Sequence, residues 1–188
     1  MQINPNNNLT PLILPLPIYT ATCIAEIVAA DETLFNIFVG LDEAMVEQLK
    51  KLSLDKSDIE LQKNTSDYRR FGTTPYEVWY SKNRTPFALI HVKTQELAAL
   101  VWFGPEPLFS KESRWHTAGW RSYNPFRGKG IMKDFATFVL KTYENKVPGI
   151  NIWIATAKNN TGSSKLAEAL GFQELSQASD EDTLIMLK

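Results

Sequence analysis

The sequence predicts one α/β (α+β) domain, in which a mixed, mostly antiparallel sheet is flanked by helices. Two observations lead to this fold class. The chain of 188 residues is 44% hydrophobic and 22% charged, which allows one sizeable buried core. After residue 75, short runs rich in β-branched and aromatic residues alternate with segments whose apolar residues recur every three or four positions. We therefore expect a single domain over residues 1–188.

The first 75 residues are expected to be mainly helical. Residues 1–10 are rich in Asn and indicate a loose terminus. Residues 19–30 and 31–39 have apolar spacing that is compatible with helices. The run GLDEAMVEQLKKLSL is typical of an amphipathic helix capped by Asp42, with Met45, Leu49 and Leu52 on its buried side. Residues 11–75 are therefore predicted to be a variable helical half.

Residues 76–188 are expected to form the sheet. The runs YEVWYS, FALIHVK and LAALVWFG are predicted strands, and a fourth strand should cover residues 115–123. A helix should start at Ile131, followed by the strand INIWIAT. A second helix over 161–170 should end at Gly171, whose missing Cβ suits a left-handed residue. The segments FQEL and TLIMLK are predicted to be the last strands.

Charge is unevenly distributed along the chain. The net charge is −1, so the overall balance predicts neither a nucleic-acid nor a membrane partner. No Lys or Arg precedes Lys50, whereas residues 111–146 contain eight basic and three acidic residues. This basic stretch suits an anionic ligand, or is a solvated basic face. The single cysteine, Cys23, excludes an internal disulfide and a cysteine metal cluster, and we expect a cytoplasmic protein without a metal site.

The basic stretch contains the loop SYNPFRGKGIMKDF. A strand that ends in a glycine turn and enters a helix leaves backbone N–H groups pointing forward, which creates an anion site. Gly128 and Gly130 would let the backbone curl around a phosphate, with Arg127 and Lys129 at the rim. The alternative is an ordinary turn whose glycines permit positive φ. The spacing matches neither a P-loop nor a dinucleotide-binding turn of the Rossmann type.

The loop in its context resembles the acyl-CoA-binding motif of the GCN5-related N-acetyltransferase (GNAT) family. The family pattern Q/R-x-x-G-x-G/A maps onto residues 125–130, with Pro125 in place of the usual Gln or Arg. Downstream, NTGSSKLAEALGF is similar to the family's N-x-x-A…G-F element, with Asn160 as its first residue. The resemblance extends over residues 87–188.

The resemblance implies how a cofactor would be held. The strand ending at Tyr123 would splay from a parallel central neighbour, strand 150–156, with the pantetheine arm in the gap. The main chain of Ser122 and Tyr123 would pair with the pantetheine amides, the pyrophosphate would lie on the loop amides, and Asn160 would meet the arm or simply cap its helix. The cofactor-binding residues implied are Ser122, Tyr123, Arg127, Gly128, Lys129, Gly130, Ile131 and Asn160.

The activity implied is transfer of an acetyl group from acetyl-CoA to an amine of a small molecule or protein, by direct attack in a ternary complex. His116, on the strand before the loop, is the candidate general base because imidazole titrates near neutral pH, with His91 and Glu96 as further candidates. The tyrosine acid that is frequent in the family is replaced by Ala167. The alternative is a non-catalytic acyl-CoA-binding or protein-interaction module on the same fold. A homodimer is compatible with either function.

One further basic segment lies outside this motif. The segment SDYRRFG contains Arg69 and Arg70, which would suit an acceptor carboxylate or form a solvated turn.

Overall fold

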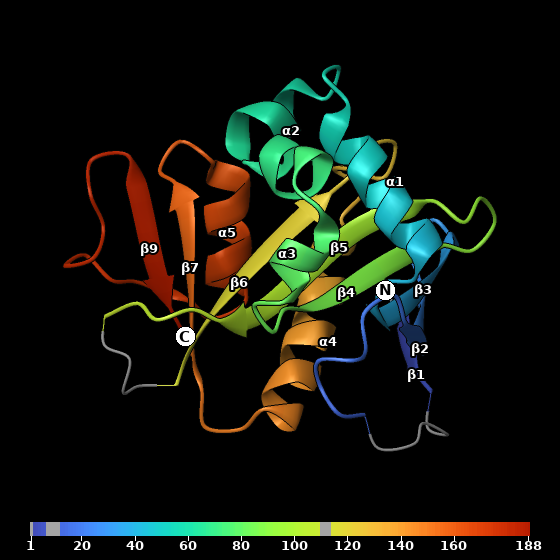
Figure 1. Ribbon diagram of the computed structural model, residues 1–188, viewed down its shortest axis with the longest axis horizontal. Helices are drawn as coiled ribbons and strands as arrows, with labels where there is room; N and C mark the ends of the chain where they lie inside the picture. The colour runs from blue at the N-terminus through green and yellow to red at the C-terminus, as the bar shows by residue number, and fades with distance from the viewer. Residues whose placement is uncertain (1, 7–11, 110–113) are drawn as a thin grey trace.

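The computed structural model describes residues 2–6, 12–109 and 114–188, and these contain nine strands that form one sheet (Figure 1). The strands are β1 (Gln2–Pro5), β2 (Ala21–Val28), β3 (Leu34–Gly40), β4 (Thr85–His91), β5 (Leu97–Pro105), β6 (Trp115–Ser122), β7 (Asn151–Ala157), β8 (Gln173–Glu174) and β9 (Thr183–Leu187). The helices are α1 (Glu43–Leu54), α2 (Ile59–Asn64), the π-helical turn η1 (Tyr68–Thr73), α3 (Tyr76–Tyr80), α4 (Ile131–Lys146) and α5 (Thr161–Ala169).

The strand order is β1-β2-β3-β4-β5-β6-β7-β9-β8. All neighbouring strands pair antiparallel except β6 and β7, which are parallel and lie near the middle of the sheet. This arrangement confirms the predicted mixed, mostly antiparallel sheet with a central parallel pair. Helix α4 connects the parallel strands, as a crossover of this kind requires.

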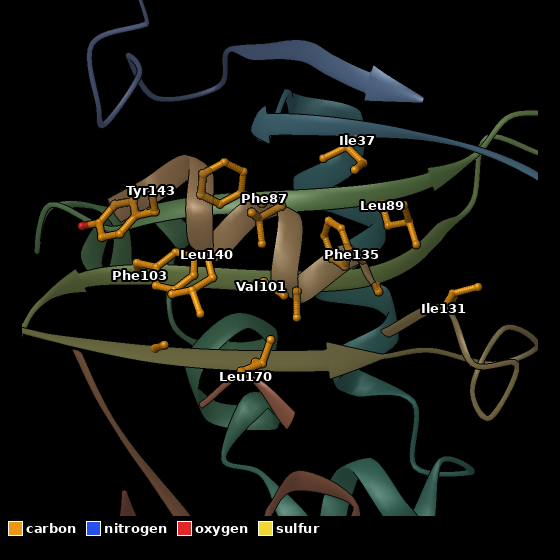
Figure 2. Close-up of a cluster of buried hydrophobic side chains, with 14 of the residues drawn as sticks. Ile37, Phe87, Leu89, Val101, Phe103, Ile131, Phe135, Leu140, Tyr143 and Leu170 are labelled. Carbon is orange, nitrogen blue, oxygen red and sulfur yellow. The ribbon is translucent and has the colours of Figure 1, made fainter. Parts of the chain in front are cut away.

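Helices cover both faces of the sheet. Helices α4 and α5 pack on one face, where the larger core cluster lies; α1, η1 and α3 pack on the other. Figure 2 shows the first of these layers, in which side chains of β3, β4 and β5 meet those of α4. The labelled residues are Ile37, Phe87, Leu89, Val101, Phe103, Ile131, Phe135, Leu140, Tyr143 and Leu170. Strand β6 pairs with β5 from His116 to Ser122 and contributes Ala118 to the larger core cluster, which positions the loop that follows it.

The prediction of a helical half was wrong for residues 21–40. This segment forms the strands β2 and β3, and the first helix of the described chain begins at Glu43. A bulge between Cys23 and Ala25 interrupts the alternation of β2, so that Ile24, Ala25 and Ile27 are all buried and mimic helical spacing. Strand β3 had a readable signal, because Phe35, Ile37 and Val39 alternate with more exposed residues.

Two other predicted boundaries changed. Residues 76–80 form helix α3, not a strand, because Tyr76, Trp79 and Tyr80 pack together at helical spacing. Within the predicted loose terminus, Gln2–Pro5 is an edge strand that pairs with β2, while residues 1 and 7–10 lie outside the described part of the chain. The basic residue Lys111 also lies outside it.

The helix ends that were predicted from capping residues are confirmed. The carboxylate of Asp42 accepts a hydrogen bond from the N–H of Met45 (2.8 Å) and caps α1. Gly171 follows α5 with φ of 88°, the left-handed value that its missing side chain permits.

Candidate functional site

The parallel strands β6 and β7 pair over only part of their length. Trp115, His116 and Thr117 pair with residues 151–153, and beyond Thr117 the two strands carry no further pairing with each other. Figure 1 shows them diverging from that point. The splayed pair implied by the family resemblance is therefore present, and it opens toward the N-terminus of α4.

The glycine loop leaves several backbone N–H groups unpaired. Among the described residues, none accepts a hydrogen bond from the amides of Gly128, Gly130, Ile131 or Met132. Among the described residues no side chain caps the start of α4 at Ile131, so its first N–H groups stay open to a ligand, although Asp134 places an acidic residue in the first turn. Gly128 and Gly130 have φ of 79° and 74°, and a Cβ built on either would meet no atom within 4 Å. The glycines thus permit the turn and keep open the space in front of these amides.

A cavity of about 700 Å³ occupies the gap between the strands and the loop. Its described walls come from the glycine loop, the ends of β6 and β7, the start of α5, and α2 with the segment that follows it. Five basic side chains and one acidic side chain line it: Arg70, Arg121, Arg127, Lys129, Lys133 and Glu60. The positive excess suits an anionic ligand.

Arg127 lines the cavity, but its guanidinium is engaged by other residues of the protein. Its guanidinium donates to both carboxylate oxygens of Asp58 (2.6 and 2.7 Å) and twice to the carbonyl of Ser122. A longer contact of 3.4 Å joins it to Glu60. These hydrogen bonds, above all those from Arg127, hold the pKa of Asp58 below its usual range. Arg127 therefore ties the loop to the start of α2, and Lys129 and Lys133 remain as the loop's unpaired cations among the described residues.

The main chain of β6 presents alternate residues to the cavity. The N–H of Tyr123 donates to Ala98 of β5, so the peptide groups of Trp120 and Ser122 face the opposite way, toward β7. The carbonyl of Tyr123 is also occupied, because it accepts from the amides of Phe126 and Arg127. Both main-chain groups of Tyr123 are therefore occupied, whereas Ser122, whose carbonyl accepts from Arg127, keeps its N–H open toward the gap.

The start of α5 contributes polar groups to the opposite wall. Asn160 caps the helix by accepting from the N–H of Ser163 (3.2 Å), which matches its predicted capping role, and it also lines the cavity. The hydroxyl of Ser163 accepts from the indole N–H of Trp120 (3.1 Å). Its own proton is therefore available to another partner. This pair was missed by the sequence analysis, because no local pattern links a strand tryptophan to a helix serine.

The candidate base His116 lies away from this cavity. It sits in the paired portion of β6, and its Nδ1 is 2.7 Å from the hydroxyl of Tyr143 on α4. Burial, with smaller contributions from Arg114 and Arg84, lowers the pKa of His116. The residues of β6 that line the cavity are Trp120, Arg121 and Ser122, all beyond Thr117, whereas His116 precedes that point.

The other candidate acids and bases lie elsewhere as well. His91 and Glu96 belong to the hairpin between β4 and β5, where both contact the hydroxyl of Thr94. Ala167, at the position of the family's tyrosine, is fully buried in the core. Burial raises the pKa of Tyr123, whose side chain has no exposed surface, and raises that of Tyr143 to about 12. Of the described residues lining the cavity, none is a tyrosine or a histidine.

A buried ion cluster was also missed. The carboxylate of Asp67, which has no exposed surface, binds Arg121 through two hydrogen bonds (2.5 and 2.9 Å) and Arg70 through one (2.9 Å). The sequence placed Arg70 in a polar segment but gave no sign of this arrangement, because Arg121 is 54 positions away from Asp67.

Residues 2–6, 12–109 and 114–188 include no helix long and apolar enough to span a membrane. The same residues include no group of three or more His, Cys, Asp or Glu side chains placed to hold a metal ion.

A mixed sheet with one splayed parallel pair, whose gap opens onto unpaired amides at a helix N-terminus, defines an acyl-CoA-binding fold of the kind that the motif implied. The family model described as "Acetyltransferase (GNAT) domain" matches residues 23–173. The chain therefore belongs to the GNAT acetyltransferase family, whose acyl donor is acetyl-CoA.

Solved structures agree on the fold. The ribosomal L7/L12 alpha-N-protein acetyltransferase RimL is 19% identical with a TM-score of 0.62, covering 94% of this chain and 98% of that chain. The spermidine N-acetyltransferase from Vibrio cholerae, solved with CoA and spermine, is 16% identical with a TM-score of 0.63, covering 81% and 94%. The GNAT domain of S. lividans PAT is 12% identical with a TM-score of 0.64, covering 87% and 94%. No curated protein matches the chain significantly by sequence.

Proposed function

We propose that the protein is an N-acetyltransferase, which transfers an acetyl group from acetyl-CoA to an amine of a small molecule or protein by direct attack in a ternary complex. The observation that carries this proposal is the continuity of the β6–β7 gap with the four unpaired amides at the head of α4. When bound, acetyl-CoA supplies a thioester whose carbonyl carbon is open to attack by an amine.

The loop residues would hold the diphosphate. The amides of Gly128, Gly130, Ile131 and Met132 would donate hydrogen bonds to the phosphate oxygens, as the uncapped start of a helix can do. Lys129, together with Lys133, adds positive charge at the rim. Arg127 has a positioning role, because it fixes the loop through Asp58 without reaching the ligand itself.

The strand and α5 would hold the pantetheine arm and the reacting end. The N–H groups of Trp120 and Ser122 face the gap, where they can pair with the arm and with the oxygen on which charge develops. Asn160, which lines the cavity at the start of α5, would face the arm from the other side. Attack by the neutral amine would form the amide C–N bond as the thioester C–S bond breaks, and the proton lost from the amine nitrogen would pass to the departing thiolate, directly or through water. Ser163 would donate a hydrogen bond to that thiolate, a weak assistance that suffices because a thiol with a pKa near 8.5 is a tolerable leaving group.

The first experiment measures binding and turnover separately. Calorimetry with acetyl-CoA should show one site, and Gly128→Glu should abolish it, because a carboxylate would enter the space in front of the amides. Gly149→Glu is the matched control: Gly149 also has positive φ (71°) but lies beyond the far end of α4. Unchanged affinity in Gly128→Glu would refute the diphosphate assignment. Thiol release across a panel of amines then measures acetyl transfer.

A non-catalytic acyl-CoA-binding or protein-interaction module is the second candidate. It is favoured by Ala167 at the family's tyrosine position and by the lack of a tyrosine or histidine among the described cavity-lining residues. Binding of acetyl-CoA without thiol release in the presence of any amine would support this candidate and refute catalysis.

A further inference from the structure

The wall of the cavity next to β6 carries more positive charge than its surroundings neutralise. Two guanidinium groups, those of Arg70 and Arg121, line this wall. The guanidinium of Arg84 does not line it, but lies over the indole ring of Trp102, as does that of Arg70. Two carboxylates pair with them: Asp67, shared by Arg70 and Arg121, and Glu106, which binds Arg84. The cluster therefore has one positive charge in excess.

The excess resides on Arg70. Arg121 uses all three of its nitrogens, two on the shared carboxylate and one on the carbonyl of Trp120. Arg70 uses one nitrogen only, on the same carboxylate, and its Nε and second Nη donate to no described residue. Its side chain is 29% exposed and lines the cavity. Burial lowers the pKa of Arg70, and the nearby carboxylate of Asp67 offsets this only in part.

The position of Arg70 relates it to the reacting end of the cavity. Its guanidinium carbon lies 5.5 Å from the ring centre of Trp102. That ring lies directly against Gly119 of β6, where an added Cβ would come within 2.5 Å of it. Gly119 is two residues beyond Thr117, the last residue of β6 that pairs with β7. Arg70 is thus held beside the point where the strands diverge, whereas Lys129 and Lys133 lie at the loop end.

We propose that Arg70 binds a carboxylate of the acceptor, so that the preferred amine belongs to a molecule or peptide with an acidic group near the amino group. The inference rests on the proposed acetyl transfer and specifies its acceptor class. Two free N–H groups of a guanidinium match the two oxygens of a carboxylate, and partial burial strengthens that pairing. The same charge repels polycationic amines, which separates this acceptor class from polyamines.

The test uses acceptors in matched pairs that differ only in charge. Peptides with Asp at the second position are compared with Asn peptides, and free amino acids with their amides; spermidine is the cationic control. We expect the wild-type protein to use the carboxylate member with a kcat/KM about tenfold to a hundredfold higher, chiefly through KM. Equal use of both members, or a preference for spermidine, would overturn the inference.

Variants assign the preference to one side chain. Arg70→Gln should remove it, and Arg70→Lys should keep part of it because the charge remains. Arg69→Gln is the matched control, since Arg69 is an exposed neighbour that does not line the cavity, and it should leave the preference intact. Thermal melting of each variant shows that it is folded. A preference that persists in folded Arg70→Gln would refute the assignment.

Two further arms separate the possible failures. With a neutral amine, an Arg70-dependent preference for succinyl-CoA over acetyl-CoA would place the carboxylate on the acyl group and overturn the acceptor assignment. If neutral amines are acetylated without any carboxylate preference, the inference fails while the proposed function stands. If no amine is acetylated, calorimetry of the Asp and Asn peptides with the CoA-saturated protein decides: selective, Arg70-dependent binding of the Asp peptide supports the inference, and its absence refutes it.

Discussion

Replacing Arg127 with Ala tests how the phosphate loop is held in place. The guanidinium makes five hydrogen bonds: two to the carboxylate of Asp58, two to the carbonyl of Ser122 and one to Glu60. The side chains of Arg127 and Asp58 are 18% and 9% exposed, so water competes weakly for this pair. Glu60 is 66% exposed and its longer contact contributes little.

The size of the effect follows from these contacts. A hydrogen bond to a charged group stabilises a protein by about 1.5–3 kcal/mol when it is shielded. Asp58 keeps its capping bond from the N–H of Leu61 in the variant, which limits the loss. We therefore expect the free energy of unfolding to fall by about 2 kcal/mol, and Tm to fall by about 4–8 °C for a chain of this size.

Thermal melting of Arg127→Ala, Asp58→Ala and the double variant measures the coupling directly. We expect a coupling energy of at least about 1 kcal/mol between the two residues. Lys129→Ala is the control: it removes the same charge from the same loop but breaks no ion pair among the described residues, so Tm should change by less than about 1 °C. Two results would refute the conclusion that the Arg127–Asp58 ion pair holds the loop in place: a Tm of Arg127→Ala equal to that of the wild type, or changes in unfolding free energy that simply add in the double variant.

The same pair predicts a dependence of stability on pH. Because the pKa of Asp58 is lower in the folded state than the unfolded value of about 3.9, its stabilisation is complete well above that value. This stabilisation is lost as the pH falls from the pKa of Asp58 in the unfolded state toward its pKa in the folded state. Chemical denaturation between about pH 6 and pH 3 should show a smaller decline in Arg127→Ala than in the wild type. Parallel curves would contradict the lowered pKa.

Three substitutions test other parts of the site. His116→Gln should keep the acetylation rate within about twofold, since His116 contacts Tyr143 away from the cavity; a hundredfold loss with a changed pH–rate profile would reinstate it as the base. Asp67→Asn should lower the free energy of unfolding by about 3–5 kcal/mol, because two guanidiniums lose their shared anion, and a Tm within about 2 °C of the wild type would contradict this. Ser163→Ala should lower kcat about threefold to tenfold, as expected for the loss of one neutral hydrogen bond, and should leave the affinity for acetyl-CoA nearly unchanged. An unaltered kcat would show that Ser163 has no part in the reaction and that its hydroxyl serves only to bind Trp120.

The amino-acid sequence alone was sufficient to predict the features that depend only on residues close together in the chain. Glycines at 128 and 130, between a strand and a helix, set the positive φ values and the unpaired amides, because a turn and a helix start are decided within a few residues. The cap at Asp42 and the left-handed Gly171 were local for the same reason. The family motif could be recognised in the sequence because the groups expected to bind the ligand are mostly main-chain amides of consecutive residues. Expected features that remain predictions are the cytoplasmic location and a possible homodimer.

Features that depend on distant partners were decided by the tertiary structure. The charge of Arg127 seemed free in its loop, but its partner Asp58 is 69 positions away; the carboxylate that binds Arg121 is 54 positions away. His116 looked well placed because strand position gives no indication of where pairing with β7 ends. The strand β2 resembled a helix because a bulge, which forms only against β3, shifted its alternation. In each case the free energy comes from contacts that exist only once the sheet has formed, so no local pattern encodes them.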